Sequence, residues 1–359
     1  MSELVARSDM THGHSMHWLR IRLFADSPFA TPLRGDTLFG QLCWRIREVA
    51  GEQALTQLLD GYLEQKPFAV ISDPFAADHL PRPQAPAYLF GFDKLDARKR
   101  KEVKGKRWLP LTALELPLHQ WAHHLRSNEE VLKTAGHSIA SLQQTEFQPH
   151  NSINRLTMTT GDEFAPYSSE QHWLHPELGL DIYILHDERI STEKLIVRLN
   201  EIGLLGYGKD ATIGKGRFHV QPVVMPELPE PSESQMLLTL APSAPQGGEW
   251  HDALCFYSPL VRFGRHGSNL VIQGQPYKNP LLLADTAALM TPVKPHQQNF
   301  VGMGLGGNGI ISAAMPQTVH QGYARLVYAK GVEHLRHVAH LGHALRLGGI
   351  RYRSEEHTS

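Results

Sequence analysis

The sequence predicts an α+β fold whose first half follows a strand, helix, strand, strand, helix, strand order. Three observations support this order. Residues 17–24 alternate apolar and polar side chains, which is typical of a strand with one buried face. Residues 192–202 repeat apolar side chains at helical spacing, and a glycine-rich stretch then leads into a second strand-like segment at 217–224. The order is that of a ferredoxin-like βαββαβ domain.

The other elements of the first half follow from local signals. Asp36 is a favourable N-cap for a helix that carries apolar residues inward as far as residue 49, after a loop that two prolines hold extended. A second helix is predicted over 53–63 and a short strand over 68–72. A strand over 180–185 precedes the helix at 192–202.

Residues from about 73 to 180 are predicted to be an insertion, because prolines interrupt the strand and helix rhythm there. Within it, residues 98–107 carry seven cations and one acid. Such a run is typical of a solvated face, with RNA contact as the functional alternative. Short helical pieces are predicted over 109–115 and 120–125. Residues 150–157 supply closely spaced hydrogen-bonding side chains, which suit a single nucleic-acid strand.

The chain divides into two domains joined by a proline-rich linker at 226–234. The first domain is predicted over 16–225. The second, more divergent α+β domain covers 235–330 and contains short strands and many glycines. A C-terminal helix is expected over 331–352. Residues 1–15 resemble a non-native or disordered extension, and residues 353–359 resemble an assembly artefact.

The composition is that of a globular protein without a global charge. The 359 residues are 41% hydrophobic and 20% charged, and the formal net charge is −1. Any RNA contact must therefore come from local clusters or arise within an assembly. The two cysteines, Cys43 and Cys255, form no CxxC pair, and no apolar run is long enough to span a membrane. We expect a cytoplasmic protein without membrane contact.

The glycine-rich stretch at 203–218 packs five glycines and three cations into sixteen residues. Glycine lets backbone N–H groups approach a ligand closely, so a backbone cradle for phosphates is the first hypothesis. A mononucleotide P-loop needs four residues between Gly and Gly-Lys, followed by Ser or Thr. Here five residues separate Gly208 from Gly214, and Gly216 replaces the hydroxyl residue. The order helix, loop, strand is also the reverse of a P-loop, so we reject an ATPase.

Two further groups of residues are candidates for RNA contact. Arg34 and Gly35 lie at the start of the first helix, where backbone N–H groups attract phosphate, although an ordinary helix start with a solvated arginine is the simpler alternative. Tyr207 and Phe218 are possible stacking rings for bases. For Phe218, a core position on a strand is the favoured alternative.

Other motifs give weaker signals. Gly304, Gly306 and Gly309 fit GxGxxG, but Pro316 leaves no room for a crossover helix, so we expect no dinucleotide cofactor. The histidines at every third position from His334 to His343 drift around a helix and could not ligate one metal. We therefore expect no metal, cofactor or catalytic residue.

One catalytic alternative remains open. His150 with Lys104 or Lys106 could act as a metal-independent ribonuclease, with imidazole as the base and an ammonium group beside the phosphate.

Three stretches together resemble the RAMP proteins of CRISPR systems. They are residues 31–40 (TPLRGDTLFG), residues 150–155 (HNSINR) and residues 206–218 (GYGKDATIGKGRF). The match is best to the fourth subunit of the Csm-type (type III-A) effector complex. The similarity runs from about residue 16 to residue 328, and the glycine loop between helix and strand is its most specific part.

The resemblance implies a non-catalytic subunit of two ferredoxin-like RAMP domains with an inserted thumb. Such a subunit grips the 5′ handle of the guide RNA, docks the large polymerase-like subunit and the first backbone RAMP subunit, and uses its thumb to kink the guide. The implied RNA-binding residues are Arg34, Gly35, Asn151, Asn154, Arg155, Lys209, Gly214, Lys215, Gly216 and Arg217. A guide-processing endoribonuclease and a protein-only scaffold remain as alternatives.

Overall fold

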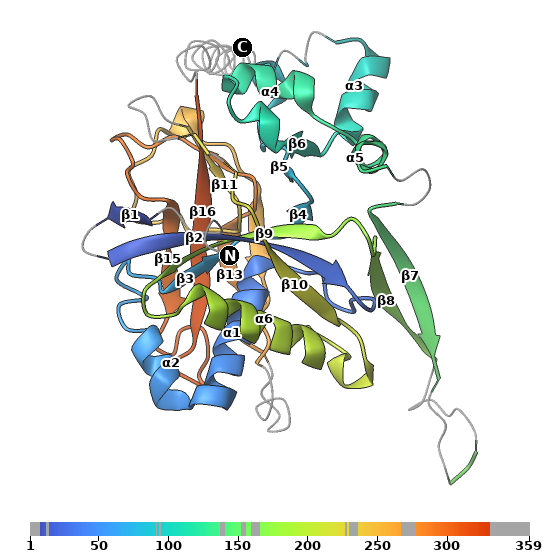
Figure 1. Ribbon diagram of the computed structural model, residues 1–359, viewed down its shortest axis with the longest axis vertical. Helices are drawn as coiled ribbons and strands as arrows, with labels where there is room; N and C mark the ends of the chain where they lie inside the picture. The colour runs from blue at the N-terminus through green and yellow to red at the C-terminus, as the bar shows by residue number, and fades with distance from the viewer. Residues whose placement is uncertain are drawn as a thin grey trace, which may run out of the picture.

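The computed structural model describes residues 8–11, 14–90, 92, 95–136, 141–151, 156–158, 166–226, 228–229, 236–266 and 277–330. Helices and antiparallel sheets are mixed in it, which confirms the predicted α+β class. Figure 1 shows two sheets whose strands cross in this view, a helical module at the top and a long hairpin at the side. The expectations for residues 331–352 and 353–359 lie outside the described residues.

The first sheet has six strands. They are β1 (Ser8–Thr11), β2 (His14–Ala25), β3 (Ala69–Ile71), β4 (Phe75–Ala76), β9 (Leu180–Asp187) and β10 (Phe218–Val223). β2 pairs with β9 on one edge, while β1 and β10 share its other edge. The strands therefore lie in the order β10, β2, β9, β3. Part of the expected extension, residues 8–11, pairs with β2 instead of remaining apart from the fold.

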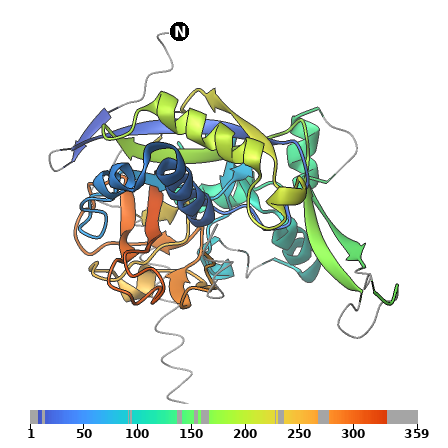
Figure 2. The same cartoon turned by 90° about the horizontal axis from the view of Figure 1, so that it is seen from below.

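The helices of the first half are α1 (Gly35–Ala50), α2 (Glu52–Leu58) and α6 (Thr192–Leu205). Figure 2 shows α1 and α6 next to each other along the first sheet. In α6, Leu195, Leu199 and Ile202 recur at helical spacing, and all three are buried in the first core. Burial of these three side chains holds α6 against the sheet. α2 is shorter than the predicted helix, because residues 59–65 form turns.

The predicted N-cap of the first helix is wrong. α1 begins at Gly35, and its N-cap residue Arg34 makes no side-chain capping bond. Asp36 lies inside the first turn, where its carboxylate forms a bidentate pair with the guanidinium of Arg262 at 2.6 Å for each oxygen. Asp36 therefore joins the two halves of the chain instead of capping a helix.

The insertion leaves the sheet after β4 and has two parts. The helical module contains β5 (His79–Pro81), η1 (Ala87–Phe90), α3 (Ala97–Gly105), β6 (Trp108–Pro110), η3 (Leu111–Ala113), α4 (Leu118–His124) and α5 (Asn128–Thr134). The hairpin contains β7 (Gln143–His150) and β8 (Tyr167–Leu174). Trp121 is fully buried in a core that the module shares with β11 and β14 of the second half. The module therefore packs on the second half, while the hairpin projects away (Figure 1).

The second half is built from strands. They are β11 (Met236–Thr239), β12 (Pro259–Arg262), β13 (Leu281–Ala284), β14 (Leu289–Met290), β15 (Phe300–Gly306) and β16 (Val319–Ala329), with one short 3-10 turn, η6 (Asp252–Leu254). Four strands form a sheet in the order β14, β11, β16, β15. Residues 236–266 and 277–330 contain no α-helix. A second βαββαβ arrangement is therefore not confirmed among these residues.

Side chains of β16 join the two sheets through hydrogen bonds to β3 and to the turns after α2. Gln321 is fully buried, and its amide donates to Ile71 O at 2.8 Å and accepts from Ile71 N at 2.9 Å. The hydroxyl of Tyr323 donates to the carbonyl of Tyr62 at 2.5 Å. These contacts satisfy the otherwise free edge of β3. The glycine loop lies at the opposite edge of the sheet and remains open to solvent.

Among the residues that the structure describes, no helix has the length and apolar character needed to cross a membrane.

Candidate nucleic-acid interface

The glycine loop runs from the end of α6 to the start of β10 and folds back on itself. Gly206 and Gly216 have φ angles of 101° and 69°, which favour glycine. A Cβ on Gly216 would lie 2.1 Å from the carbonyl oxygen of Tyr207, and the N–H of Tyr207 donates to Gly216 O at 2.8 Å. The glycines therefore allow the two arms of the loop to approach each other.

Several backbone N–H groups of this loop are already used within the protein. They donate from Lys209 to Thr31 Oγ1 (2.9 Å), from Gly214 to Ala211 O (3.0 Å), from Lys215 to Asp210 O (3.2 Å), from Gly216 to Pro28 O (2.8 Å) and from Arg217 to Ser27 Oγ (2.8 Å). The amides of Lys209, Gly216 and Arg217 hold the loop on the segment 27–31, and those of Gly214 and Lys215 bond within the loop, so none of these five points at a free phosphate. A role of Gly214 and Gly216 in RNA binding stays a prediction, and the cationic side chains of the loop are the stronger candidates.

Tyr207 and Phe218 are core residues and not stacking rings. Both are buried, at 0% and 2% exposure. The hydroxyl of Tyr207 accepts from the N–H of Arg34 and donates to the carbonyl of Pro32, each at 3.1 Å. The core alternative for Phe218 is confirmed, and Tyr207 instead ties the glycine loop to the start of α1.

Arg34 and Gly35 are engaged by acids of the chain. The guanidinium of Arg34 lies 2.9 Å from Asp73 Oδ2 and 3.3 Å from Asp285 Oδ1, and the N–H of Gly35 donates to Asp73 Oδ1 at 2.8 Å. Burial raises the pKa of Asp73, and the nearby Arg34 acts in the opposite direction. A Cβ on Gly35 would lie 2.5 Å from Ile71 O. A carboxylate of the chain thus lies where the sequence predicted a phosphate, and a role for these two residues in RNA binding stays a prediction.

Lys215 is the residue through which the glycine loop contacts the hairpin. Its ammonium group donates to Gln171 Oε1 at 2.8 Å and to Gln148 Oε1 at 3.2 Å. Gln171 belongs to β8 and is 4% exposed, whereas Gln148 belongs to the exposed strand β7. The base of β8 is fixed to the first domain by backbone hydrogen bonds in both directions between Phe29 and His172. The loop and the hairpin therefore form one continuous surface.

Other predicted cations lie beside this contact. The side chain of Lys209 is 51% exposed, and its ammonium group is 3.9 Å from Asp210. Arg217 is exposed, and its guanidinium makes no hydrogen bond or ion pair with a described residue. Asn151 is exposed at the end of β7, while Asn154 and Arg155 lie outside the described residues.

The sequence did not reveal the aromatic pair at the far end of the hairpin. The rings of His150 and Tyr167 stack at 5.1 Å, and the Nε2 atom of His150 lies 2.7 Å from Ser169 Oγ. Phe147 and Trp173, also on the hairpin, are 69% and 44% exposed. β7 is largely exposed, and the residues that β8 buries, Ser169 and Gln171, are polar, so apolar alternation gave no clear signal for a hairpin.

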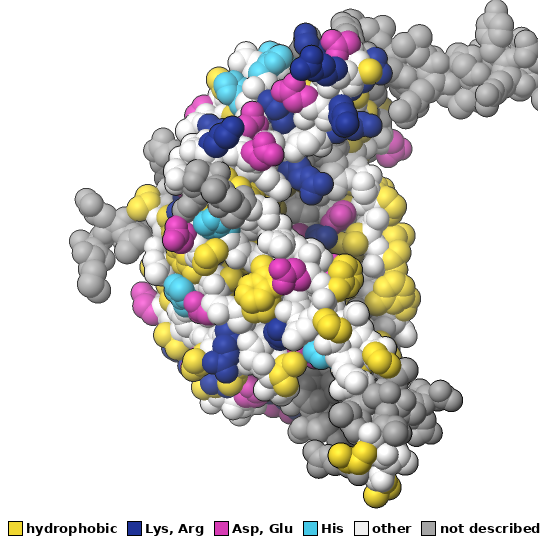
Figure 3. Space-filling model, turned by 90° about the vertical axis from the view of Figure 1, so that its right-hand side faces the viewer, with side chains coloured by type: hydrophobic (Ala, Val, Ile, Leu, Met, Phe, Trp, Pro, Cys, Tyr) yellow, Lys and Arg dark blue, Asp and Glu magenta, His cyan; other side chains and the backbone are white. Residues whose placement is uncertain are grey.

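His150 and the cations of residues 98–107 are not brought together. Lys106 lies 3.8 Å from Glu102 and 3.5 Å from Glu130, within the helical module. Figure 1 places α3 at the top of the molecule and β7 along its side. Figure 3 shows Lys and Arg side chains gathered at the top of this face, with acidic side chains among them. The charge run is therefore a solvated helix surface, α3, whose contact with RNA stays a prediction.

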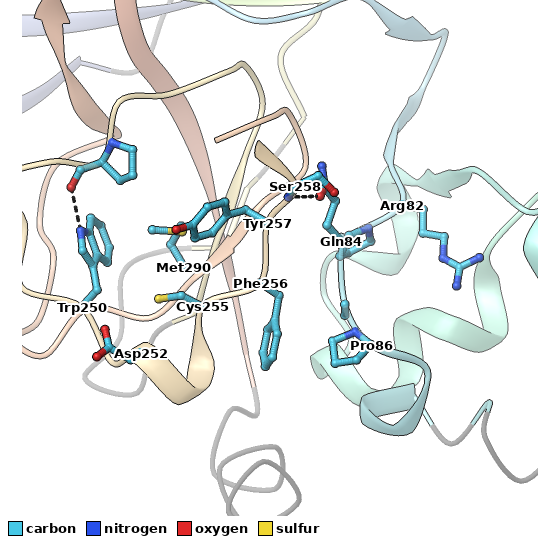
Figure 4. A pocket seen from close by; sticks show the side chains of 13 residues that line it. Arg82, Gln84, Pro86, Trp250, Asp252, Cys255, Phe256, Tyr257, Ser258 and Met290 are labelled. Carbon is cyan, nitrogen blue, oxygen red and sulfur yellow. Dashed lines mark hydrogen bonds between the residues drawn. The ribbon is translucent and has the colours of Figure 1, made fainter. Parts of the chain in front are cut away.

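A cleft of about 1000 Å³ lies between residues 82–86 and the second half (Figure 4). Its polar groups mostly hold the walls together. The N–H of Ser258 donates to Gln84 Oε1 at 2.6 Å, and the guanidinium of Arg82 donates to Val103 O at 2.8 Å. This cleft is the seam between the helical module and the second half, and none of its lining residues belongs to the glycine loop. In the described part of the chain, no three side chains group as metal ligands.

No protein-family model matches the chain, and neither does any curated protein. Solved structures do match it. The crystal structure of a Csm3-Csm4 subcomplex in the type III-A CRISPR-Cas interference complex contains a chain with 15% identity and a TM-score of 0.52, over 86% of this chain and 99% of that one.

Two crystal structures of Csm1-Csm4 cassettes also contain a chain that matches this one. Those with AMPPNP and with cA4 match at 15% and 14% identity, each with a TM-score of 0.51, over 87% of this chain and 98% of theirs. The structural neighbours are the Csm4 chains of these complexes. The expected resemblance is therefore confirmed at the level of the fold, which is what identities this low can show.

Proposed function

We propose that the chain is a Csm4-type, non-catalytic subunit of a type III-A CRISPR effector complex, and that it holds the 5′ handle of the guide RNA on the surface formed by its glycine loop and hairpin. The proposal is supported by the similarity of the whole fold to Csm4 chains in complexes with Csm1 and with Csm3. We accordingly propose a large polymerase-like subunit and a backbone RAMP subunit as partners.

The contact between Lys215 and Gln171 is the observation that carries the RNA role. From Lys215, polar side chains continue along one face of the hairpin through Gln171 and Ser169 to the stacked rings of His150 and Tyr167. Single-stranded RNA needs cations for its phosphates and rings for unstacked bases. This face supplies both kinds of group in one line.

The two-domain RAMP architecture is part of the same proposal. The first half has the element order β2, α1, β3, β9, α6, β10, with α6 leading into the glycine loop. We propose that the second half is a divergent RAMP domain whose sheet packs directly on the first domain and on the helical module. The bidentate pair between Asp36 and Arg262 supports this fixed arrangement.

Guide retention in the assembled complex tests the proposal. We expect complexes reconstituted with the Lys215→Ala, Arg217→Ala double variant to assemble but to retain less guide RNA. Complexes with Lys294→Ala, a change at an exposed ion pair in the second half, should retain it normally. Equal retention in both would contradict the RNA role and favour a protein-only scaffold. Specific cleavage of repeat RNA by the purified wild-type chain without metal would instead favour the ribonuclease.

A further inference from the structure

A second cavity, of about 380 Å³, lies between α1, α2 and residues 307–319. Its walls come from both halves of the chain and are largely apolar, with Phe39 and Trp44 of α1, Leu55 of α2 and Val319 of β16. Its volume falls within the range of small-molecule pockets. None of its lining residues belongs to the glycine loop or the hairpin, so it is separate from the proposed RNA surface.

Lys278 lines this cavity and has no counter-ion among the residues that the structure describes. Its ammonium group makes no hydrogen bond or ion pair with a described residue. Its aliphatic stem passes close to Gly264, where an added Cβ would lie 2.9 Å from Lys278 Cδ, and its backbone N–H donates to Gly264 O at 2.9 Å. Burial lowers the pKa of Lys278, while Cys43 and Asp36 act in the opposite direction. Asp36 already pairs with Arg262, so the ammonium group keeps its capacity for an anion.

Tyr62 also lines the cavity and carries a second unused donor, a hydroxyl that is itself buried beneath the wall. The residue is 1% exposed, and its hydroxyl has no hydrogen-bond partner in the described part of the chain. The ring is fixed, because it stacks on Phe39 at 5.1 Å and meets Tyr323 edge-on at 5.2 Å. A buried hydroxyl without a partner is destabilising, because it loses its hydrogen bonds to water. Such a cost is offset when a ligand supplies the acceptor.

The hydroxyl of Thr318, which also lines the cavity and has no hydrogen-bond partner in the described residues, is a further donor, whereas Cys43 and Arg47 do not compete for the anion. Burial raises the pKa of the free Cys43 thiol to about 12, so the thiol stays neutral. Arg47 pairs with Glu52 at 2.9 Å. Two further acids, Asp60 and Glu64, come from the exposed turns after α2. Of the two lining cations, Arg47 and Lys278, Lys278 is thus the one without a charge partner in the described part of the chain.

We propose that this cavity binds a small amphipathic anion, with its apolar or aromatic body between α1 and α2 and its anionic group on Lys278 and Tyr62. The apolar walls provide burial, and the charged hydrogen bond orients the ligand. The site does not depend on the proposed RNA role. It assigns a function to two donors that otherwise lack a partner.

Binding of an anionic fluorescent probe to the full chain tests the site. 1-Anilinonaphthalene-8-sulfonate carries an aromatic body and one sulfonate, and octanoate and 1-octanol share a tail but differ in charge. We expect saturable probe binding that octanoate displaces at least about tenfold more effectively than 1-octanol, because a charged hydrogen bond contributes about 1.5–3 kcal/mol.

Single substitutions test whether the probe and octanoate bind in this cavity. Lys278→Met should abolish the preference for octanoate and Tyr62→Phe should reduce it, whereas Lys294→Met should leave it unchanged. Thermal unfolding of each variant establishes that it is folded. Absence of saturable binding to the wild-type chain, or an unchanged preference in folded Lys278→Met, would overturn the proposal.

Discussion

The ammonium group of Lys215 lies 2.8 Å from the side-chain oxygen of Gln171, which is almost completely buried at the base of the hairpin. This contact connects two segments that are 44 residues apart in the chain. It places a lysine of the glycine loop beside the line of polar and aromatic groups on the hairpin. This hydrogen bond helps to hold the hairpin beside the loop, together with the backbone bonds between Phe29 and His172, and Lys215→Ala removes it.

The glycine loop should depend on Gly216 more than on Gly214. Both residues have positive φ, but a Cβ on Gly216 would lie 2.1 Å from Tyr207 O, whereas in the described structure a Cβ on Gly214 would enter open space. We expect Gly214→Ala to cost about 1 kcal/mol through backbone strain alone. Gly216→Ala should cost about 3 kcal/mol or more, since the two arms of the loop must move apart. Urea unfolding measures both, and equal costs would refute this explanation of the loop.

The Asp36–Arg262 pair should contribute strongly to stability. The carboxylate is fully buried, and the guanidinium side chain is 26% exposed. Asp36→Asn leaves Arg262 without its charge partner, so we expect a loss of about 3 kcal/mol in the free energy of unfolding. The exposed pair between Lys294 and Glu249 is the control, and its removal should cost less than about 1 kcal/mol. Similar losses in the two variants would show that the pair between the halves is not special.

The Asp36 carboxylate should also make the free energy of unfolding depend on pH in the acid range. Burial acts to raise the pKa of Asp36, but the imidazole of His320, whose Nε2 lies 3.3 Å from the carboxylate, and the charge of Arg262 outweigh it and hold the pKa well below its ordinary value. A group with a lowered folded pKa stabilises the protein above its unfolded pKa of about 3.9. This contribution is lost as the pH falls further. The difference in unfolding free energy between wild type and Asp36→Asn should therefore narrow below about pH 4, and a constant difference down to pH 2.5 would contradict the assignment.

Replacement of Arg325, unlike that of Asp36, should not destabilise the protein. The residue is fully buried, its three guanidinium nitrogens have no hydrogen-bond partner in the described residues, and it lies over the ring of Trp18 at 3.7 Å. Burial lowers its pKa, with the charge of Tyr183 acting in the opposite direction. Replacement of such a charge by an apolar side chain is often neutral or stabilising. We expect Arg325→Met to unfold at an equal or higher urea concentration, and a loss of 3 kcal/mol or more would reveal a partner for the charge.

Local patterns in the sequence were sufficient for the regular elements of the first half. Alternation predicted β2, and helical spacing predicted α6 to within three residues at its C-terminal end. The helical module was harder to predict, because its packing surface is supplied by the second half. One signal was overlooked: Ser127 and Glu130 form a capping box at the start of α5.

The candidate site was predictable in composition but not in geometry. The sequence identified the glycine loop, with Lys215 and Arg217, as a candidate for RNA contact. It could not show that the amides of Lys209, Gly216 and Arg217 are used internally, since their acceptors lie at residues 27 to 31, between 178 and 190 residues earlier. Nor could it pair Arg34 with Asp285, which depends on how the two halves pack.

The salt dependence of RNA binding by the assembled complex tests the central claim most directly. A plot of log K against log salt concentration has a slope of about −0.7 for each phosphate contact to a single strand. For complexes with the Lys215→Ala, Arg217→Ala variant, we predict weaker binding and a slope shallower by about 1 to 2 than for wild type, with Lys294→Ala unchanged. An identical slope and affinity for wild type and the double variant would contradict the claim that this surface holds the RNA backbone.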